Sequence, residues 1–137
     1  MFKRIMVPVD LTHADRLQKA LDVAGDLAAH YGAKLIYVGV SASTPSSIAH
    51  TPEEYGEKLA VFAKAKALAA GVEVESFPVI THDPAVDLDP ALVKAVLDTD
   101  ADLVVMASHI PGIADHFWPS NGGTVASRAK VSVMVVR

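Results

Sequence analysis

The sequence predicts an α/β fold: a single open, doubly wound sheet of five parallel strands with helices on both faces. Apolar runs of strand length alternate with segments of helical periodicity along the 137 residues, a pattern typical of right-handed β-α-β crossovers. The apolar runs are continuous rather than alternating, which indicates strands buried on both sides of the sheet. The chain is long enough to bury a core of its own, and no linker, internal repeat or low-complexity segment divides it. We therefore expect one domain over residues 1–137.

The first strand and the first helix follow from two adjacent patterns. Ile5–Val9 is an apolar run of strand length. Apolar residues then recur at spacings of three and four up to Tyr31, as on one side of an amphipathic helix. Gly32 stands where a left-handed C-cap would end that helix. Leu35–Val40 is the expected second strand, and the polar segment after it is a loop.

The second helix is expected to begin at Thr51. Thr51 suits the N-cap, Pro52 suits the first helical position, and Glu54 completes a capping box. Four residues form the expected buried stripe, and a glycine ends the helix: Tyr55, Leu59, Phe62 and Ala69, then Gly71.

The third strand, Val72–Ile80, contains Pro78. Because proline has no N–H to donate to a ladder, we expect this strand at an edge of the sheet.

The last third of the chain repeats the alternation. Asp89 and Pro90 suit the N-cap and the first residue of a third helix that continues over Ala91–Leu97. The fourth strand is Leu103–Met106, a short helix follows over about residues 121–129, and Val131–Val136 is the fifth strand. We expect this last strand at a sheet edge, where pairing with a second copy of the chain is favoured.

Composition excludes several classes of function. Hydrophobic residues make up 51% of the chain and charged residues only 20%, so a disordered polymer is excluded. Cysteine is absent, which removes disulfides, thiol catalysis and thiolate metal sites. A formal net charge of −4 argues against nucleic acid as a partner. No apolar run is long enough for membrane insertion, and no secretory signal is evident, so we expect a soluble, cytoplasmic protein.

The carboxyl ends of the expected strands point to a ligand site. Open parallel sheets bind ligands beyond these ends, where the strand order reverses. The segment ASHIPGIADHFWPSNGG, residues 107–123, leaves the sheet at that edge and leads into the start of a helix. Free amides and the helix dipole favour an anion there.

Segments near both ends of the chain resemble the universal stress protein family. At the start this is Ile5–Asp10. In the last third these are Asp102–His109, Ser120-Asn121 and Val131–Arg137. The order and length of the elements resemble this family over essentially the whole chain. The resemblance implies the strand order 3-2-1-4-5 and an adenine nucleotide, ATP or AMP, between strands one and four. It also implies a homodimer built around the last strand.

The resemblance also assigns roles to individual residues. Asp10 would contact ribose or adenine, Pro8 and Val9 would form the floor, and Val40 would offer backbone groups to the adenine edge. Beyond strand four, the expected contacts to ribose and phosphates are Met106, Ala107, Ser108, His109, Ser120, Asn121 and Gly122.

The phosphate loop departs from the common family form. ATP-binding members usually carry Gly-x-x-Gly, nine residues, then Gly-Ser or Gly-Thr, whereas Ala107 and Ile110 occupy the first two glycine positions and Pro119 precedes Ser120. The form Ala-Ser-His-x-Pro with a later Ser-Asn resembles a subgroup that retains nucleotide binding. Residues 97–127 contain no Lys or Arg, so a triphosphate would rely on amides, hydroxyls, His109 and a Mg²⁺ ion.

Other interpretations of the same residues stay open. Asp10, Ser120 and Asn121 are ordinary N-cap residues, and a cap and a phosphate site use the same geometry. A cation site among His82, Asp83, Asp87 and Asp89 is disfavoured by its spacing.

Three function classes compete. The first is a nucleotide-binding regulatory module without strong catalysis, acting on a regulatory protein that the sequence does not identify. The second is a nucleotide-free homodimeric interaction module of the same fold. The third is an enzyme or a phosphoacceptor resembling a response-regulator receiver, suggested by Asp10, Asp83 and Ser108. It is disfavoured because strand one is followed by one acidic residue, no lysine closes strand five, and hydrolase and Walker motifs are missing.

Overall fold

The computed structural model describes residues 1–108, 123 and 125–137. Its five strands are β1 (Arg4–Val9), β2 (Lys34–Ala42), β3 (Val74–Thr81), β4 (Leu103–Ala107) and β5 (Ser132–Val136). The described helices are the 3₁₀ helix η1 (Leu11–Leu17), then α1 (Gln18–Tyr31), α2 (Pro52–Ala70) and α3 (Pro84–Asp98), with a further helical turn at residues 125–128.

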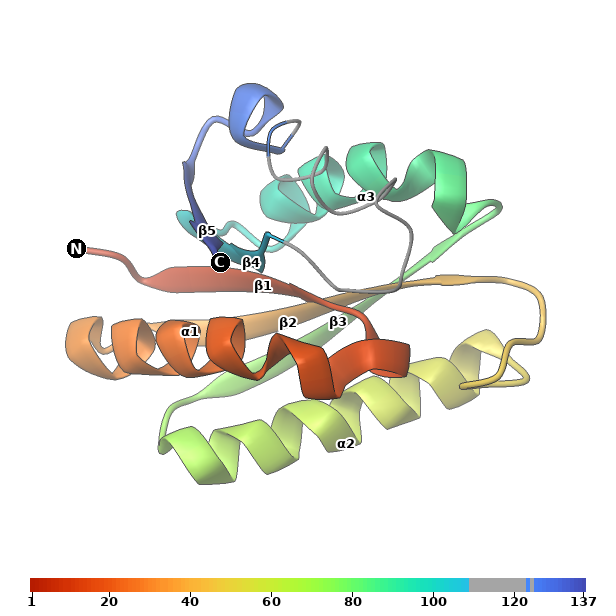
Figure 1. Cartoon of the computed structure of the whole chain (residues 1–137), viewed down its shortest axis with the longest axis horizontal. Helices are drawn as coiled ribbons and strands as arrows, with labels where there is room; N and C mark the ends of the chain where they lie inside the picture. Colours follow the sequence, from red (N-terminus) through yellow and green to blue (C-terminus); the bar gives the residue numbers. More distant parts are fainter. Residues whose placement is uncertain (109–122, 124) are drawn as a thin grey trace.

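The sheet is parallel throughout and has the order β3-β2-β1-β4-β5. Helices α1 and α2 lie on one face of the sheet and α3 on the other (Figure 1). The predicted fold class and strand order are therefore confirmed. The proline-bearing strand β3 and the last strand β5 occupy the two edges, as expected.

The central strands carry the core. In β1 and β4 almost every side chain is buried, from Ile5 to Val9 and from Leu103 to Ala107. Helix α1 adds Leu21, Ala24 and Ala28 from one side, which is the stripe that its periodicity predicts. Continuous apolar strands thus fill the middle layer of a three-layer fold.

Charged groups tie together the amino-terminal edge of the sheet. The Asp102 carboxylate accepts hydrogen bonds from the amides of Lys3 (2.9 Å) and Arg4 (3.1 Å), which joins β1 to the start of β4. On the other side, the Lys34 ammonium lies 2.8 Å from the carboxylates of both Glu73 and Glu75. These bonds raise the pKa of Lys34 and lower that of Glu75. The candidate ligand site lies on the opposite side of the sheet, at the carboxyl ends of the strands.

The predicted ends of α1 and α2 are largely confirmed. Gly32 and Gly71 both adopt the left-handed conformation, with φ of 64° and 67°. The Thr51 hydroxyl accepts a hydrogen bond from the Glu54 amide at 3.1 Å, as an N-cap should. The Glu54 carboxylate bonds the His50 amide instead of the Thr51 amide, so only half of the capping box forms.

One member of the buried stripe of α2 was predicted wrongly. Ala69 is exposed, and Ala63 takes its place in the core. Ala63 lies four residues after Leu59 and so continues the same helical face.

Helix α3 begins six residues earlier than predicted. The chain carries two Asp-Pro pairs, and the first of them starts the helix: the Asp83 carbonyl accepts bonds from the amides of Val86 (3.1 Å) and Asp87 (2.8 Å). Asp89 is therefore not an N-cap, and Pro90 lies inside the helix. Proline at the first helical position costs no hydrogen bond, so either pair satisfied the sequence pattern.

No helix in the described ranges is both long and apolar enough to cross a membrane.

Candidate functional site

Three neighbouring strands bring the predicted nucleotide residues together. Pro8 and Val9 end β1 and Asp10 follows it, Val40 lies near the end of β2, and Met106 and Ala107 end β4 with Ser108 directly after. Val9 is the register partner of Gly39, so Asp10 and Val40 each lie one residue beyond this pair. His109, Ser120, Asn121 and Gly122 lie outside the described residues. One edge of the sheet therefore assembles the described part of the predicted site.

Strands β1 and β4 stop pairing well before their carboxyl ends. Their ladder has only two register pairs, Ile5 with Leu103 and Met6 with Val104. Beyond that point β1 still pairs with β2 through Val9, and β4 still pairs with β5 through Ala107. Crossovers run to opposite sides of this seam, which makes it the switch point of the sheet. Backbone groups of residues 7–9 and 105–107 are thus released from mutual pairing where a ligand would enter.

Asp10 is held by its own turn. One carboxylate oxygen accepts a hydrogen bond from the Thr12 amide at 3.0 Å, and the other lies 3.1 Å from Nδ1 of His13. Asp10 therefore caps η1, which is one of the two interpretations open from the sequence. Each carboxylate oxygen carries two lone pairs, so the side chain can still accept further hydrogen bonds. The contact with His13 was missed, although Asp-x-x-His spacing in a turn after a strand was available as a signal.

Tyr55 of α2 reaches the same edge, although the sequence indicated only a core residue. Its side chain is 5% exposed, and its ring lies directly over Gly39 of β2, where an added Cβ would overlap the hydroxyl and stand 3.0 Å from Cζ. Burial and then the negative charge of Asp10 raise the pKa of Tyr55, so the phenol stays neutral. Nothing in the sequence pattern shows that this hydroxyl approaches Asp10, because the approach depends on how α2 packs on β2.

Ser108 differs from expectation in one respect. Its amide donates to the Val136 carbonyl at 2.8 Å, which extends the β4–β5 ladder by one bond. This amide is therefore already used and cannot also hold a phosphate oxygen, whereas the hydroxyl makes no hydrogen bond within the described part of the chain. Met106 is fully buried and Ala107 is 7% exposed, so both would form the floor of a site.

Two buried polar atoms have no hydrogen-bond partner among the described residues. They are Oγ1 of Thr81, at the end of β3, and one carboxylate oxygen of Asp89 on α3. Asp89 lies three residues before Leu92, which is 1% exposed, so both belong to the helix face that packs on the sheet. The sequence predicted Asp89 as a helix N-cap, so it gave no indication of a buried carboxylate oxygen here.

Metal-ligating side chains do not converge within the described ranges. They contain no group of three or more His, Cys, Asp or Glu side chains that could hold a metal ion. Of the four residues weighed above as a cation site, Asp83 and Asp87 are joined by a hydrogen bond from the Asp83 amide to the Asp87 carboxylate at 3.2 Å. This bond is part of the start of α3.

Comparison with known proteins gives a consistent family assignment. The model of the universal stress protein family matches residues 1–137. A universal stress protein crystallised in complex with cAMP is 26% identical, with a TM-score of 0.71 over 99% of this chain and 97% of that one. No curated protein matches the chain.

Two more distant structures share the fold. A universal stress protein from Archaeoglobus fulgidus in complex with dAMP is 20% identical, with a TM-score of 0.67 over 98% of both chains. A family member from Arabidopsis thaliana with AMP bound is 16% identical, with a TM-score of 0.64 over 98% of this chain and 90% of that one.

Proposed function

Because the chain belongs to the universal stress protein family, we propose that it is a stress-response regulatory protein that binds an adenine nucleotide at the carboxyl ends of β1 and β4. The observation that carries this proposal is the short β1–β4 ladder, which ends after Met6 and Val104 and frees backbone groups at the switch point. Family structures solved with cAMP, dAMP and AMP support the ligand class.

Each described residue of the site has a distinct part in the proposal. The Asp10 carboxylate accepts hydrogen bonds from the ribose hydroxyls with its remaining lone pairs, while its turn holds it in place. Val40 offers backbone groups to the adenine edge. Pro8, Val9, Met106 and Ala107 form an apolar floor.

The described residues favour a nucleotide with few phosphates. Among the described residues assigned to the site, Asp10 carries the charge, and residues 97–127 contain no Lys or Arg that could offset a triphosphate. AMP is accordingly the first candidate. ATP would bind together with Mg²⁺, which would offset its charge without needing a basic side chain.

Strong catalysis is not part of the proposal. The Asp10–His13 pair has the spacing of a base and its orienting group, but among the described residues no hydrogen bond joins the His13 ring to a Ser or Thr hydroxyl. We infer a binding protein whose readout is occupancy rather than turnover.

Strand β5 is the proposed contact with a second copy of the chain. It is the outer strand next to β4, and Met134 and Val135 are 40% and 43% exposed. An apolar edge strand of this kind favours pairing with another chain. A regulatory protein of a different sequence would then recognise the dimer.

A nucleotide-free interaction module of the same fold is the second candidate. It is favoured by the Ser108 amide, which the chain uses for its own ladder instead of leaving it for a phosphate.

Nucleotide content and affinity distinguish the two candidates. The protein is purified under mild conditions and denatured, and the supernatant is assayed for adenine nucleotides; AMP and ATP are then titrated by calorimetry with and without Mg²⁺. Asp10→Ala should weaken AMP binding about tenfold or more, the loss expected when a charged acceptor is removed. Asp10→Asn keeps the cap and one acceptor and should weaken binding less.

Asp15→Asn provides the matched control, because Asp15 is exposed and lies in the same 3₁₀ helix. Its AMP affinity should equal that of the unmodified chain. Absence of co-purified nucleotide together with absence of binding at millimolar concentration would favour the nucleotide-free module. Unchanged affinity in both Asp10 variants would show that the site lies elsewhere.

A further inference from the structure

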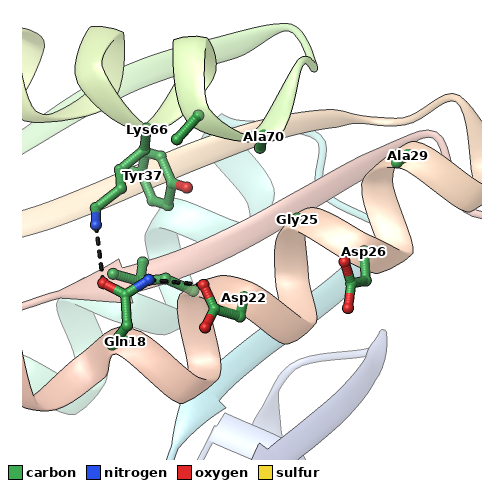
Figure 2. A pocket seen from close by; sticks show the side chains of 10 residues that line it. Gln18, Asp22, Gly25, Asp26, Ala29, Tyr37, Lys66 and Ala70 are labelled. Atoms are coloured by element: carbon green, nitrogen blue, oxygen red, sulfur yellow. Dashed lines mark hydrogen bonds between the residues drawn. The ribbon is translucent and has the colours of Figure 1, made fainter.

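A hollow of about 460 Å³ opens between α1 and α2, on the face of the sheet that these helices cover (Figure 2). Its floor is Tyr37 of β2, Asp22, Gly25 and Asp26 line it from α1, and Lys66 and Ala70 line it from α2. None of the residues assigned to the nucleotide lines this hollow. Its size falls within the range of small-molecule sites in proteins. We call it the α1–α2 hollow.

Small side chains let α1 and α2 approach closely at one end of the hollow. An added Cβ at Gly25 would stand 3.4 Å from the Cβ of Ala70, so the two helices meet here through their smallest residues. The remaining volume is lined by polar groups on the α1 side and by an apolar strip where Gly25 and Ala70 face each other. A ligand in the hollow would therefore rest on both kinds of surface.

The hydroxyl of Tyr37 is the buried polar group on the floor. The side chain is only 1% exposed, and its ring packs edge-on against Phe62 with centroids 5.5 Å apart. Within the described part of the chain this hydroxyl has no hydrogen-bond partner, and it lies in the space between the two helices (Figure 2). Burial, with a smaller contribution from the charge of Asp22, raises the pKa of Tyr37 to about 12. The phenol is thus neutral and can both donate and accept.

The charged side chains that line the hollow offer more hydrogen-bond acceptors than their neighbours use. The Asp22 carboxylate accepts one bond from Gln18 at 2.6 Å, and the Lys66 ammonium donates to the other end of the same Gln18 at 3.0 Å. Lys66 also lies 5.6 Å from the centroid of the Phe62 ring. Among the described ion pairs, none involves Asp22 or Asp26. The two carboxylates therefore retain free lone pairs that favour a cation with N–H donors.

The distance between these two carboxylates determines which cations can pair with both of them. Asp22 and Asp26 are one helical turn apart, which places them about 6 Å from each other along the axis, close to the separation of the two nitrogens in an extended four-carbon diamine. A metal ion fits poorly, since the described residues contain no group of three metal-ligating side chains. The methylene chain of a diamine would lie on the strip formed by Gly25 and Ala70.

We propose that the α1–α2 hollow binds a small aliphatic diamine. One ammonium group pairs with Asp22 and donates to the Tyr37 hydroxyl, the second pairs with Asp26, and the methylene chain lies on the strip formed by Gly25 and Ala70. This site is separate from the proposed nucleotide site and does not depend on it.

Titration of the full-length protein with 1,4-diaminobutane tests the proposal, with binding followed by calorimetry and by amide NMR shifts. 1-Aminobutane and 1,4-butanediol serve as ligand controls that lack one or both charges. We expect saturable binding of the diamine, weaker binding of the monoamine, no binding of the diol, and shifts concentrated in α1, β2 and the carboxyl-terminal half of α2. Asp22→Asn and Asp26→Asn should each weaken diamine binding about tenfold, and Tyr37→Phe should weaken it severalfold.

Asp15→Asn is again the matched control, because it removes the same charge outside the hollow and should leave diamine affinity unchanged. A thermal melt of each variant verifies that it is folded. No saturable binding at millimolar concentration would overturn the proposal. Equal loss in Asp15→Asn and Asp22→Asn would also overturn it, because the attraction would then come from net charge alone. AMP titrations of the same variants should be unaffected, which separates this outcome from that of the proposed nucleotide site.

Discussion

Gly39 shows how a single residue shapes the proposed nucleotide site. Its missing side chain leaves room for the hydroxyl end of Tyr55 against β2, where the charge of Asp10 acts on the phenol. Here the requirement is for space, because φ at Gly39 is not positive; the described glycines with positive φ are Gly32 and Gly71. A strand residue at this position therefore determines where a helix side chain can go.

Gly39→Ala should lower the free energy of unfolding by about 1–3 kcal/mol, the usual cost of overpacking a core. The loss should be smaller in a Tyr55→Phe background, since the hydroxyl that the new methyl group meets first is then absent. Urea denaturation of the four proteins measures both values and their coupling.

Gly56→Ala is the matched control, because an added Cβ there would stand 3.7 Å from Pro78 in ordinary contact. Within α2 this change should raise stability by about 0.5–1 kcal/mol. An equal penalty for Gly39→Ala with and without the Tyr55 hydroxyl would contradict the steric explanation.

Helix α3 contains an internal proline, Pro90, which the sequence pattern predicted at the first helical position. Pro90 cannot donate to the Val86 carbonyl, whereas Pro84 occupies the first helical position, where no such bond is required. The same residue type therefore has opposite consequences at two places in one helix.

Pro90→Ala should raise the free energy of unfolding by about 1–2 kcal/mol, because the regained hydrogen bond and lost strain exceed the extra flexibility of the unfolded chain. Pro84→Ala should bring no gain. Denaturant unfolding of both variants checks this. A loss of stability in Pro90→Ala would show that the proline ring contributes packing that outweighs the missing bond.

The strands could be predicted from the sequence to within two residues at each end, because continuous apolar runs are local signals. The start of α3 could not, since two Asp-Pro pairs satisfy the same rule and only tertiary packing selects between them. In the site, Asp10, Val40 and the end of β4 follow from topology. Tyr55 and Thr81 come from packing between distant segments, which residue spacing does not record.

The two ends of the sheet differ across the whole molecule. At the amino-terminal edge, Asp102, Lys34 and their partners join neighbouring strands by charge-assisted bonds. At the carboxyl edge β1 and β4 separate, and the proposed ligand site lies there. The outer strand β5 carries two half-exposed apolar residues, which the proposed dimer would cover.

The proposed dimer can be tested by placing charges on β5. In solution the unmodified chain should have twice the 14.4 kDa mass of one copy, and Met134→Lys with Val135→Lys should convert it to monomer, because lysine opposes strand pairing at an edge. Sedimentation velocity and light scattering measure this.

Val61→Lys with Leu68→Lys is the matched control, because these α2 residues are 70% and 83% exposed and lie away from β5. This control should remain dimeric. A monomeric unmodified chain at every concentration, or a double β5 variant that stays dimeric, would contradict the proposed interface.

The brevity of the β1–β4 ladder also bears on how occupancy could be transmitted. The part of the sheet made of β3, β2 and β1 is joined by backbone bonds to β4 and β5 over two register pairs only, both near the amino ends. Any molecule that contacts β1 and β4 at their far ends adds a second point of attachment between these parts, and its binding free energy then opposes their separation. Because β4 is bonded to β5 along its entire length, a movement of β4 at this seam would also move the outer strand β5.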